Sequence, residues 1–196
     1  MATIRERLAG FGPPLPSDVE DRVTRASAVL APLYDVDGRV HVILTRRAGH
    51  LRTHRGEVSF PGGGQDPGED LLDTAFREAW EEIRLPRRGI EVVGELDHLT
   101  TVSSNSYIVP FVGELPSRPT DLVPDPAEVD HILHVPLDEL TLDEVFREEH
   151  WMRAPPRART MYFFELVGDT VWGATARMLR QLLSIVLGLD PHARSE

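Results

Sequence analysis

The hydrophobic positions of this chain follow two different periods. In residues 71–83 they recur every three or four positions, which predicts an amphipathic helix with one apolar stripe. Asp70 stands where an N-cap is expected, and Pro86 prevents the helix from continuing. Residues 175–189 repeat the helical period, and residues 1–12 are expected to form a short helix that ends before the prolines of GPPLP. Three helices are therefore expected, near the beginning, in the middle and at the end of the chain.

The other apolar segments are short and rich in β-branched and aromatic residues, which predicts strands. They are residues 26–34, 39–47, 90–99, 107–115, 129–137 and 161–167. The turn DVDG joins the first two and favours a hairpin or a neighbouring pair. Residues 50–70 carry too many glycines and polar side chains for a regular element, so we expect a long ordered loop, which is more often functional than not. The proline-rich residues 115–128 are expected to form a surface loop, because a strand candidate follows at once.

The order of these elements is several strands, a central helix, further strands and a final helix. This order predicts an α/β fold, with a mixed sheet sandwiched between helices. A chain of 196 residues is long enough for one domain with a full hydrophobic core. We therefore expect a single domain over residues 1–196, with an N-terminal extension over 1–20 and the C-terminal helix within 172–196. The apolar stripe of that helix is more often core than dimer face, which leaves a homodimer open.

Composition narrows the classes of function. The formal net charge of −11 argues against nucleic-acid binding and against an anionic membrane surface. There are no cysteines, so any metal ion must be held by oxygen or histidine; the eight histidines are scattered along the chain, and none is taken as a ligand. The N-terminal residues show no signal-peptide pattern, and the longest apolar run is too short to span a bilayer. These features predict a cytoplasmic protein.

Three glutamates gather on the central helix. Glu78, Glu81 and Glu82 fall within an arc of about 100°, directly beside the apolar stripe. Like charges three and four positions apart cost roughly 0.2–0.5 kcal/mol each on an exposed helix, and more where they are partly desolvated. A divalent cation such as Mg²⁺ removes this cost and leaves room for phosphate oxygens. Taken alone, however, an acidic string of this kind is more often a solvated helix face.

The segment before the helix favours the metal interpretation. It reads FPGGGQDPGED, and its glycines allow the backbone to approach an anion closely. It leads into the N-terminal end of the helix, which is a favourable place for anions. Glu69 lies eight residues before Arg77, and a charge pair between them would fix the loop against the helix. A phosphate cradle and a divalent-metal site would then be adjacent.

This stretch resembles the Nudix box, the signature of Mg²⁺-dependent hydrolases of nucleoside diphosphates linked to another moiety. From Gly63 the chain has five residues, Glu69, seven residues, and then REAWEEIRL over residues 77–85. The loop glycine, the paired Glu and Arg, and the three metal-type glutamates all fall at the spacing of the family. The resemblance implies a Nudix-type α/β/α sandwich and a small-molecule nucleotide substrate.

The metal ligands that this resemblance implies are Glu78, Glu81, Glu82 and the carbonyl of Gly63. Arg77 and Glu69 would orient them, and the expected cofactor is Mg²⁺ or Mn²⁺. The metal would activate the water that attacks one phosphorus of a diphosphate and stabilise the charge that develops. The general base is left open between Glu82, Glu81 and Glu128 of the proline-rich loop.

At one position the chain departs from the family pattern, which has glycine where Arg84 stands. A glycine after the helix suits a left-handed C-terminal turn. Arg84 must adopt that conformation at some cost, or the helix must end differently, with Pro86 as a stop. The departure bears on the turn rather than on the metal ligands, which all lie upstream.

A basic segment over residues 44–63, LTRRAGHLRTHRGEVSFPGG, precedes and overlaps the start of the box. In a chain of negative net charge it concentrates His50, His54, Arg46, Arg47, Arg52 and Arg55. The planar fork of arginine suits phosphate, because it donates two hydrogen bonds at once. A surface loop whose arginines pair with nearby acids fits the same charge pattern, so charge alone does not decide.

The same segment resembles the motif that precedes the Nudix box in coenzyme A pyrophosphatases. The matching positions are Leu44, Thr45, Arg47, Arg52, Gly56 and Phe60 to Gly63, and residues 172–179 also resemble the start of the last helix of this subfamily. The resemblance implies cleavage of CoA or acyl-CoA to (acyl-)phosphopantetheine and adenosine 3′,5′-bisphosphate. The substrate contacts would be Arg46, Arg47, Arg52, Arg55, Gly62 and Gly63. Extra arginines would favour a substrate with the additional 3′-phosphate.

Two other functions stay open. One is a Nudix hydrolase for ADP-ribose or a dinucleotide such as NADH, which the arginine-rich segment disfavours. The other is a catalytically silent Nudix-fold binding module, which only Arg84 favours and the three crowded carboxylates oppose. Trp172 is expected in the core or an interface rather than against an adenine, and Tyr107 is treated in the same way.

Overall fold

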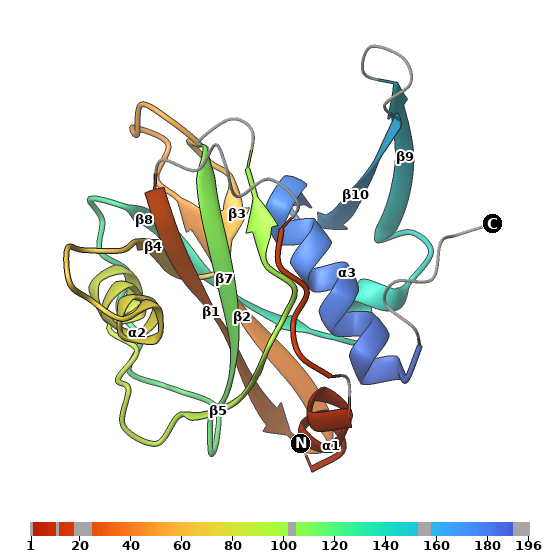
Figure 1. Ribbon diagram of the computed structural model, residues 1–196, viewed down its shortest axis with the longest axis horizontal. Helices are drawn as coiled ribbons and strands as arrows, with labels where there is room; N and C mark the ends of the chain where they lie inside the picture. The colour runs from red at the N-terminus through yellow and green to blue at the C-terminus, as the bar shows by residue number, and fades with distance from the viewer. Residues whose placement is uncertain (1, 11, 18–24, 102–104, 153–157, 190–196) are drawn as a thin grey trace.

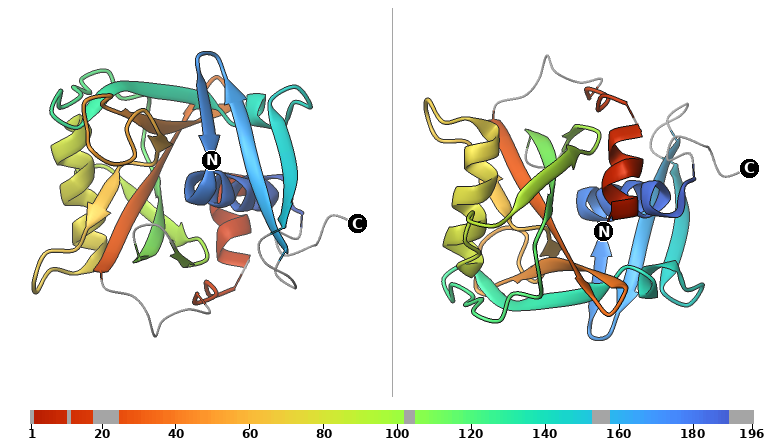
Figure 2. Two further views of the ribbon diagram at one scale, coloured as in Figure 1. Left: turned by 90° about the horizontal axis from the view of Figure 1, so that it is seen from above. Right: turned by 90° about the horizontal axis from the view of Figure 1, so that it is seen from below.

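The computed structural model describes residues 2–10, 12–17, 25–101, 105–152 and 158–189. In this part of the chain a mixed eight-stranded sheet lies between helix α2 (Leu71–Ile83) on one face and helices α1 (Ala2–Gly10) and α3 (Gly173–Leu187) on the other (Figure 1, Figure 2). The predicted α/β/α sandwich with a mixed sheet is therefore confirmed. No helix within these ranges is both long and apolar enough to cross a membrane.

The main sheet is built on β1 (Arg25–Val36), which pairs antiparallel with β2 (Arg39–Arg47) and parallel with β7 (Ser106–Glu114). The turn between β1 and β2 has positive φ at Asp37 and Gly38, 54° and 84°, as a tight two-residue hairpin requires. The remaining members are β3 (Val58–Ser59) and β8 (Val129–Pro136) on β2, β4 (Gly62–Gly64) on β1, and β5 (Glu91–Glu95) and β6 (Leu99–Thr100) on β7.

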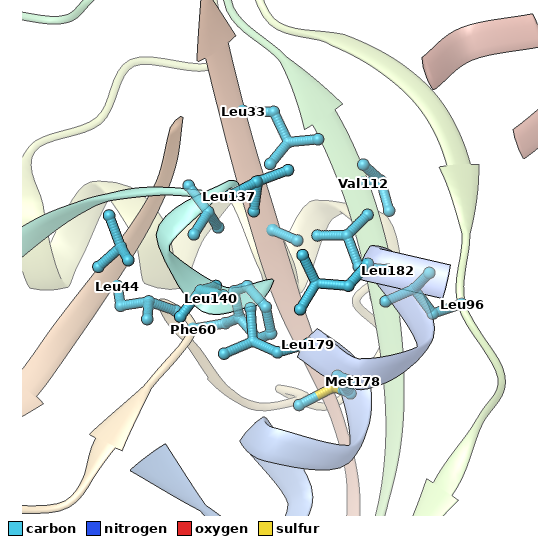
Figure 3. Close-up of a cluster of buried hydrophobic side chains, with 14 of the residues drawn as sticks. Leu33, Leu44, Phe60, Leu96, Val112, Leu137, Leu140, Met178, Leu179 and Leu182 are labelled. Atoms are coloured by element: carbon cyan, nitrogen blue, oxygen red, sulfur yellow. The ribbon is translucent and has the colours of Figure 1, made fainter. Parts of the chain in front are cut away.

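Alternation along β1 divides the core into two layers. Residues such as Ala28 and Leu30 pack in the layer of α2, whereas Val29 and Leu33 pack in the layer of α3. Figure 3 shows the second layer, in which Leu33, Val112, Leu179 and Leu182 are among the labelled side chains. Burying a leucine fully contributes roughly 1.5–3 kcal/mol. The predicted apolar stripe of the last helix therefore faces the core.

A second sheet covers the side of α3 that faces away from the main sheet (Figure 2). It consists of β9 (Phe146–Met152), β10 (Ala158–Leu166) and β11 (Asp169–Trp172), all antiparallel, in the order β11-β10-β9. A short 3-10 turn, η2 (Glu139–Thr141), follows β8. The sequence predicted only β10. FREEHWM of β9 is too polar to be read as a strand, and the four residues of β11 are too short to show a period.

The prediction of one continuous loop over residues 50–70 is wrong in part, because the segment contains β3 and β4. Strand β4 is three consecutive glycines, which β-propensity disfavours. It lies antiparallel to β1, with Gly63 opposite Ala28. Contacts from the neighbouring elements leave no space for side chains at these glycines, so tertiary packing rather than local preference selects them.

Helix α2 has the predicted bounds, and the Asp70 carboxylate accepts a hydrogen bond from the backbone N–H of Leu72 at 2.8 Å. At its other end, Arg84 adopts the left-handed conformation with φ of 57° and donates its N–H to the carbonyl of Trp80 at 2.9 Å. The guanidinium lies over the Trp80 ring, 5.6 Å from its centroid. Arg84 therefore takes the conformation expected of a glycine, and the cation–π contact offsets part of the cost.

We predict that Arg84→Gly stabilises the protein by about 1 kcal/mol, because a left-handed residue with a Cβ carries a steric cost that glycine lacks. Urea unfolding at neutral pH measures the difference. Arg84→Ala is the matched control, since it keeps the Cβ, loses the contact with Trp80 and should not gain stability. A glycine variant no more stable than wild type would mean that the Trp80 contact outweighs the strain.

Candidate active site

The glycine strand β4 lies against the acidic side of α2. A Cβ placed on Gly63 would be 2.5 Å from the carboxylate of Glu78, so only glycine allows this carboxylate to lie on the strand. The backbone N–H of Gly62 donates a hydrogen bond to Oε2 of Glu82 at 3.3 Å. Gly62 also has φ of 156° and packs against the backbone of β1. The Glu78 carboxylate thus occupies the space that a side chain at Gly63 would fill, and Glu82 contacts the backbone of the same strand.

Arg77 connects the three segments that form the site. Its Nη1 donates to Glu78 Oε1 at 3.0 Å and to Glu81 Oε2 at 2.8 Å, and its Nη2 donates to the carbonyl of Gly64 at 3.0 Å. Its Nε and Nη2 donate to the two oxygens of Glu69 at 3.0 and 3.2 Å. The expected pair between Glu69 and Arg77 is therefore present, and it is a two-pronged contact of the kind that fixes orientation.

Glu69 is held by more than Arg77. The Thr74 hydroxyl donates to Glu69 Oε2 at 2.7 Å, and the N–H of Asp66 donates to the same oxygen at 3.2 Å. The Arg77 hydrogen bond is the main reason why the pKa of Glu69 is lowered to about 2, and the Thr74 and Asp66 bonds lower it further. Glu69 is thus ionised at neutral pH and anchors the loop to the helix.

Burial shifts the pKa of Glu82 and of Glu78 in the opposite direction, upward. Glu82 is 2% exposed, and desolvation raises its pKa to about 8, although Arg47 and the N–H of Gly62 oppose the rise. Desolvation also raises the pKa of Glu78, against the opposing effect of Arg77. Glu81 differs from both because its side chain is 52% exposed. Glu78 and Glu82 are therefore buried acid groups, and the neighbouring donors and positive charges of the protein offset only part of the cost of ionising them.

Glu128 approaches the same carboxylates from the loop before β8. Its charge lies close enough to raise the pKa of both Glu78 and Glu82. The backbone fixes this loop, because the N–H of Asp125 donates to the carbonyl of Glu82 at 2.8 Å and the N–H of Ala48 donates to the carbonyl of Glu128 at 2.8 Å. The structure thus brings Glu128 to the candidate site, although 46 positions separate it from Glu82 along the chain.

The donor chemistry of this cluster fits a hard divalent cation, which prefers carboxylate and carbonyl oxygens. Desolvation raises the pKa of both Glu78 and Glu82, and a bound cation would favour the ionised form of each. Within the described ranges, no three acidic or histidine side chains converge closely enough to hold an ion as they stand. Glu78 and Glu81 point instead to Arg77 Nη1, so both would have to turn from it to share an ion.

The arginines of the basic segment have different partners. A β-bulge between Arg46 and Arg47 separates their side chains. Arg47 Nη1 lies 3.8 Å from Glu82 Oε1, and the buried Nε of Arg47 has no hydrogen-bond partner in the described part of the chain. Arg46 instead pairs with Asp169 of β11 at 3.1 Å, and more weakly with Asp130 at 3.8 Å. Of these two arginines, only Arg47 lies near a carboxylate of α2.

The loop between β2 and β3 holds the rest of the basic segment. Arg52 and Arg55 are exposed and make no ion pair with any residue that the structure describes. His54 pairs with Glu57 at 2.9 Å, and His50 contacts the carbonyl of Ala127 at 3.2 Å. None of these four side chains pairs with the carboxylates of α2 in the part of the chain that the structure describes.

A cavity of about 340 Å³ lies beside the glycine strand. Its walls come from the start of β1, the ends of β2 and β3, β4, and the first turn of α3. Gly62, Gly63 and Arg47 line it, as the sequence predicts for substrate contacts. Arg25 and Trp172 also line the cavity. Arg25 is not among the substrate contacts predicted from the sequence, and Trp172 was expected in the core or an interface.

Trp172 is 43% exposed, so it does not lie in the core, and the interface alternative stays a prediction. Trp172 is the last residue of β11, which passes directly into α3. Arg25 shares a strand face with Val29, because both occupy alternate positions of β1. The alternation of side chains along β1 could have placed Arg25 on this wall, if the strand face that carries Val29 had been known. Tyr107 is partly buried and hydrogen bonds to His98, outside the cavity wall.

Comparisons of the sequence with family models and with known proteins point to the same family. A family model described as the NUDIX domain matches residues 24–155. The uncharacterized Nudix hydrolase NudL of Photorhabdus laumondii is 38% identical over 175 residues, covering 87% of this chain and 89% of that protein. Nudix hydrolase 3 of Caenorhabditis elegans is 43% identical over 117 residues, covering 59% of this chain and 49% of that protein, so the chain spans about half its length. A solved Ap4A hydrolase binary complex from C. elegans has a TM-score of 0.49 and 19% identity, covering 59% of this chain and 82% of that one.

We predict that Glu69→Gln destabilises the fold by about 2 kcal/mol at pH 7, because it removes a charged partner of Arg77. The pKa of Glu69 is about 2 in the folded state against 4.5 for a free side chain. Its ionised form therefore stabilises the fold above pH 4.5, and this contribution is lost as the pH falls from 4.5 to 2.

Urea unfolding of wild type and variant at pH 7 and pH 3 tests this sign. The difference between the two proteins should shrink at pH 3. Glu139→Gln is the matched control, because Glu139 pairs with Arg39 on the exposed surface and should change stability by less than about 0.5 kcal/mol. A Glu69→Gln effect that is independent of pH would contradict the assignment.

Proposed function

This chain belongs to the Nudix hydrolase family, whose members are pyrophosphohydrolases that generally use divalent metal ions, and on this premise we propose that it hydrolyses the diphosphate bond of CoA or acyl-CoA with Mg²⁺ or Mn²⁺. The products are (acyl-)phosphopantetheine and adenosine 3′,5′-bisphosphate. Water adds its oxygen to one phosphorus, and the bond from that phosphorus to the bridging oxygen breaks.

The position of Arg47 carries the proposal. It belongs to the basic segment that resembles the CoA pyrophosphatase motif, and it is the arginine of that segment that both lines the cavity and approaches Glu82. Its guanidinium has an unpaired buried Nε, so its hydrogen-bonding capacity is not used up within the described protein. An arginine between a metal-type carboxylate and an open cavity is well placed to hold a diphosphate oxygen beside the reacting phosphorus.

The other residues have distinct roles in this proposal. Glu78, Glu81, Glu82 and the Gly63 carbonyl would hold the metal, which when bound supplies an activated water and compensation for developing negative charge. Arg77 and Glu69 position these ligands through the contacts that join the loop to the helix. Glu128 is the candidate general base, because it stands beside the carboxylates and belongs to a different, backbone-fixed loop.

A panel of substrates tests the proposal. The purified protein is incubated with Mg²⁺ and, separately, with CoA, dephospho-CoA, ADP-ribose and NADH, and the products are separated by chromatography. The proposal predicts that CoA is cleaved fastest and releases adenosine 3′,5′-bisphosphate. Faster cleavage of ADP-ribose or NADH would keep the metal site and reject CoA, and no cleavage with either Mg²⁺ or Mn²⁺ would favour a silent binding module.

We predict that Glu82→Gln lowers kcat by about 10²-fold or more, because it removes a charge that acts mainly in the transition state. Steady-state rates with the substrate cleaved fastest measure the loss. Glu144→Gln serves as the control, because Glu144 is exposed in the loop before β9 and should keep wild-type turnover. Wild-type turnover in the Glu82 variant would exclude Glu82 from the metal site.

A further inference from the structure

The cavity beside β4 has two arginines in its wall, at opposite ends of the glycine strand. Arg47 is at the end where Gly62 and Glu82 meet. Arg25 is at the other end, where its guanidinium fills the side-chain space of Gly64. Two residues along a strand span roughly 7 Å. The acidic residue of the same wall, Glu57, is paired with His54 at 2.9 Å.

Of the two arginines in the cavity wall, Arg25 has no acidic partner among the residues that the structure describes, whereas Arg47 approaches Glu82. Arg77 is saturated by Glu69, Glu78 and Glu81, and Arg46 is held by Asp169. Arg52 and Arg55 are not part of the cavity wall. A guanidinium that lines a cavity and lacks an acidic partner leaves its donors open to an anion from outside.

We propose that Arg25 binds the 3′-phosphate of the substrate and determines the preference for substrates that carry it. This inference rests on the proposed function, in which the diphosphate lies beside Arg47 and the carboxylates of α2. Gly62 and Gly64, which mark these two ends of the strand, lie roughly 7 Å apart, a span comparable to that between the 5′- and 3′-phosphates of one ribose. Arg25 donates a two-pronged hydrogen bond to the second phosphate while Arg47 holds the first. The arginines of the β2–β3 loop, which the sequence favours for this role, then act elsewhere.

The remaining wall of the cavity suits the base of the same nucleotide. Trp172 is an exposed aromatic ring on this wall, and Ile108 and Met178 add apolar surface beside it. The first turn of α3 completes the wall, and the field at this end of a helix favours the negative charge that Arg25 holds. Because Trp172 lies in the cavity, its fluorescence reports binding without any catalytic step.

The kinetic test compares kcat/KM for CoA and dephospho-CoA in wild type, Arg25→Gln and Arg88→Gln. Arg88 is exposed after α2 and is not in the cavity wall, so it is the matched control. Wild type and control should prefer CoA by about tenfold or more. Arg25→Gln should lose at least about tenfold on CoA and change less than about twofold on dephospho-CoA.

The binding test uses Trp172 emission in a Trp80→Phe/Trp151→Phe background, with EDTA present. Adenosine 3′,5′-bisphosphate and adenosine 5′-monophosphate are titrated separately. The first should bind more tightly by about tenfold, and Arg25→Gln should abolish this difference without changing the affinity for the monophosphate. A merely structural role of Arg25 would instead weaken both ligands alike and would overturn the inference.

The outcomes separate the two proposals. If wild type prefers CoA and Arg25→Gln keeps the preference, the inference about Arg25 is wrong and the proposed function stands. Loss of the preference in Arg52→Gln but not in Arg25→Gln would return the role to the β2–β3 loop. If wild type cleaves CoA and dephospho-CoA at equal rates, the protein does not recognise the 3′-phosphate, and the inference about Arg25 is wrong.

Discussion

The site depends on one packing constraint, the contact between the acidic face of α2 and a strand without side chains. Glu78 can lie against β4 only because Gly63 carries no side chain, and Glu82 accepts a hydrogen bond from the backbone N–H of Gly62 beside it. The same contact removes both carboxylates from water, which raises the pKa of each. Desolvation of this kind is costly for an unpaired carboxylate. Burying two carboxylates at one place is therefore costly, and carboxylate oxygens are the donors that a hard divalent cation prefers.

Arg77 makes that arrangement stable without a cation. Its guanidinium donates to the loop through Glu69, to the strand through the Gly64 carbonyl, and to the helix through Glu78 and Glu81. One side chain thus fixes the relative position of three segments. Because the same Nη1 holds both Glu78 and Glu81, ligand binding at the carboxylates is coupled to rearrangement around Arg77. The neighbouring cavity is cationic at both ends, which complements a substrate carrying several phosphates.

Local signals in the sequence predicted α2 and its cap, because Asp70, the apolar stripe and Pro86 act within a few residues of one another. They also predicted the pair of Glu69 with Arg77, which needs only the helix and the loop before it. The sequence did not predict β4, since three glycines become a strand only against β1. Arg25 was not singled out, and a place for Trp172 against an adenine was disfavoured, because some 147 positions separate the two residues and only the packing of α3 on the sheet brings both to one cavity.

The most direct measurement is Mn²⁺ binding by Gly63→Ala, followed by electron paramagnetic resonance. The added methyl would lie 2.5 Å from the carboxylate of Glu78, a flexible group that can move, so the fold should persist by circular dichroism. We predict that the affinity for Mn²⁺ falls by about tenfold or more. Gly49→Ala, at a glycine with open space around it, should bind Mn²⁺ as wild type does. Wild-type affinity in Gly63→Ala would contradict the claim that the bare strand creates the metal site.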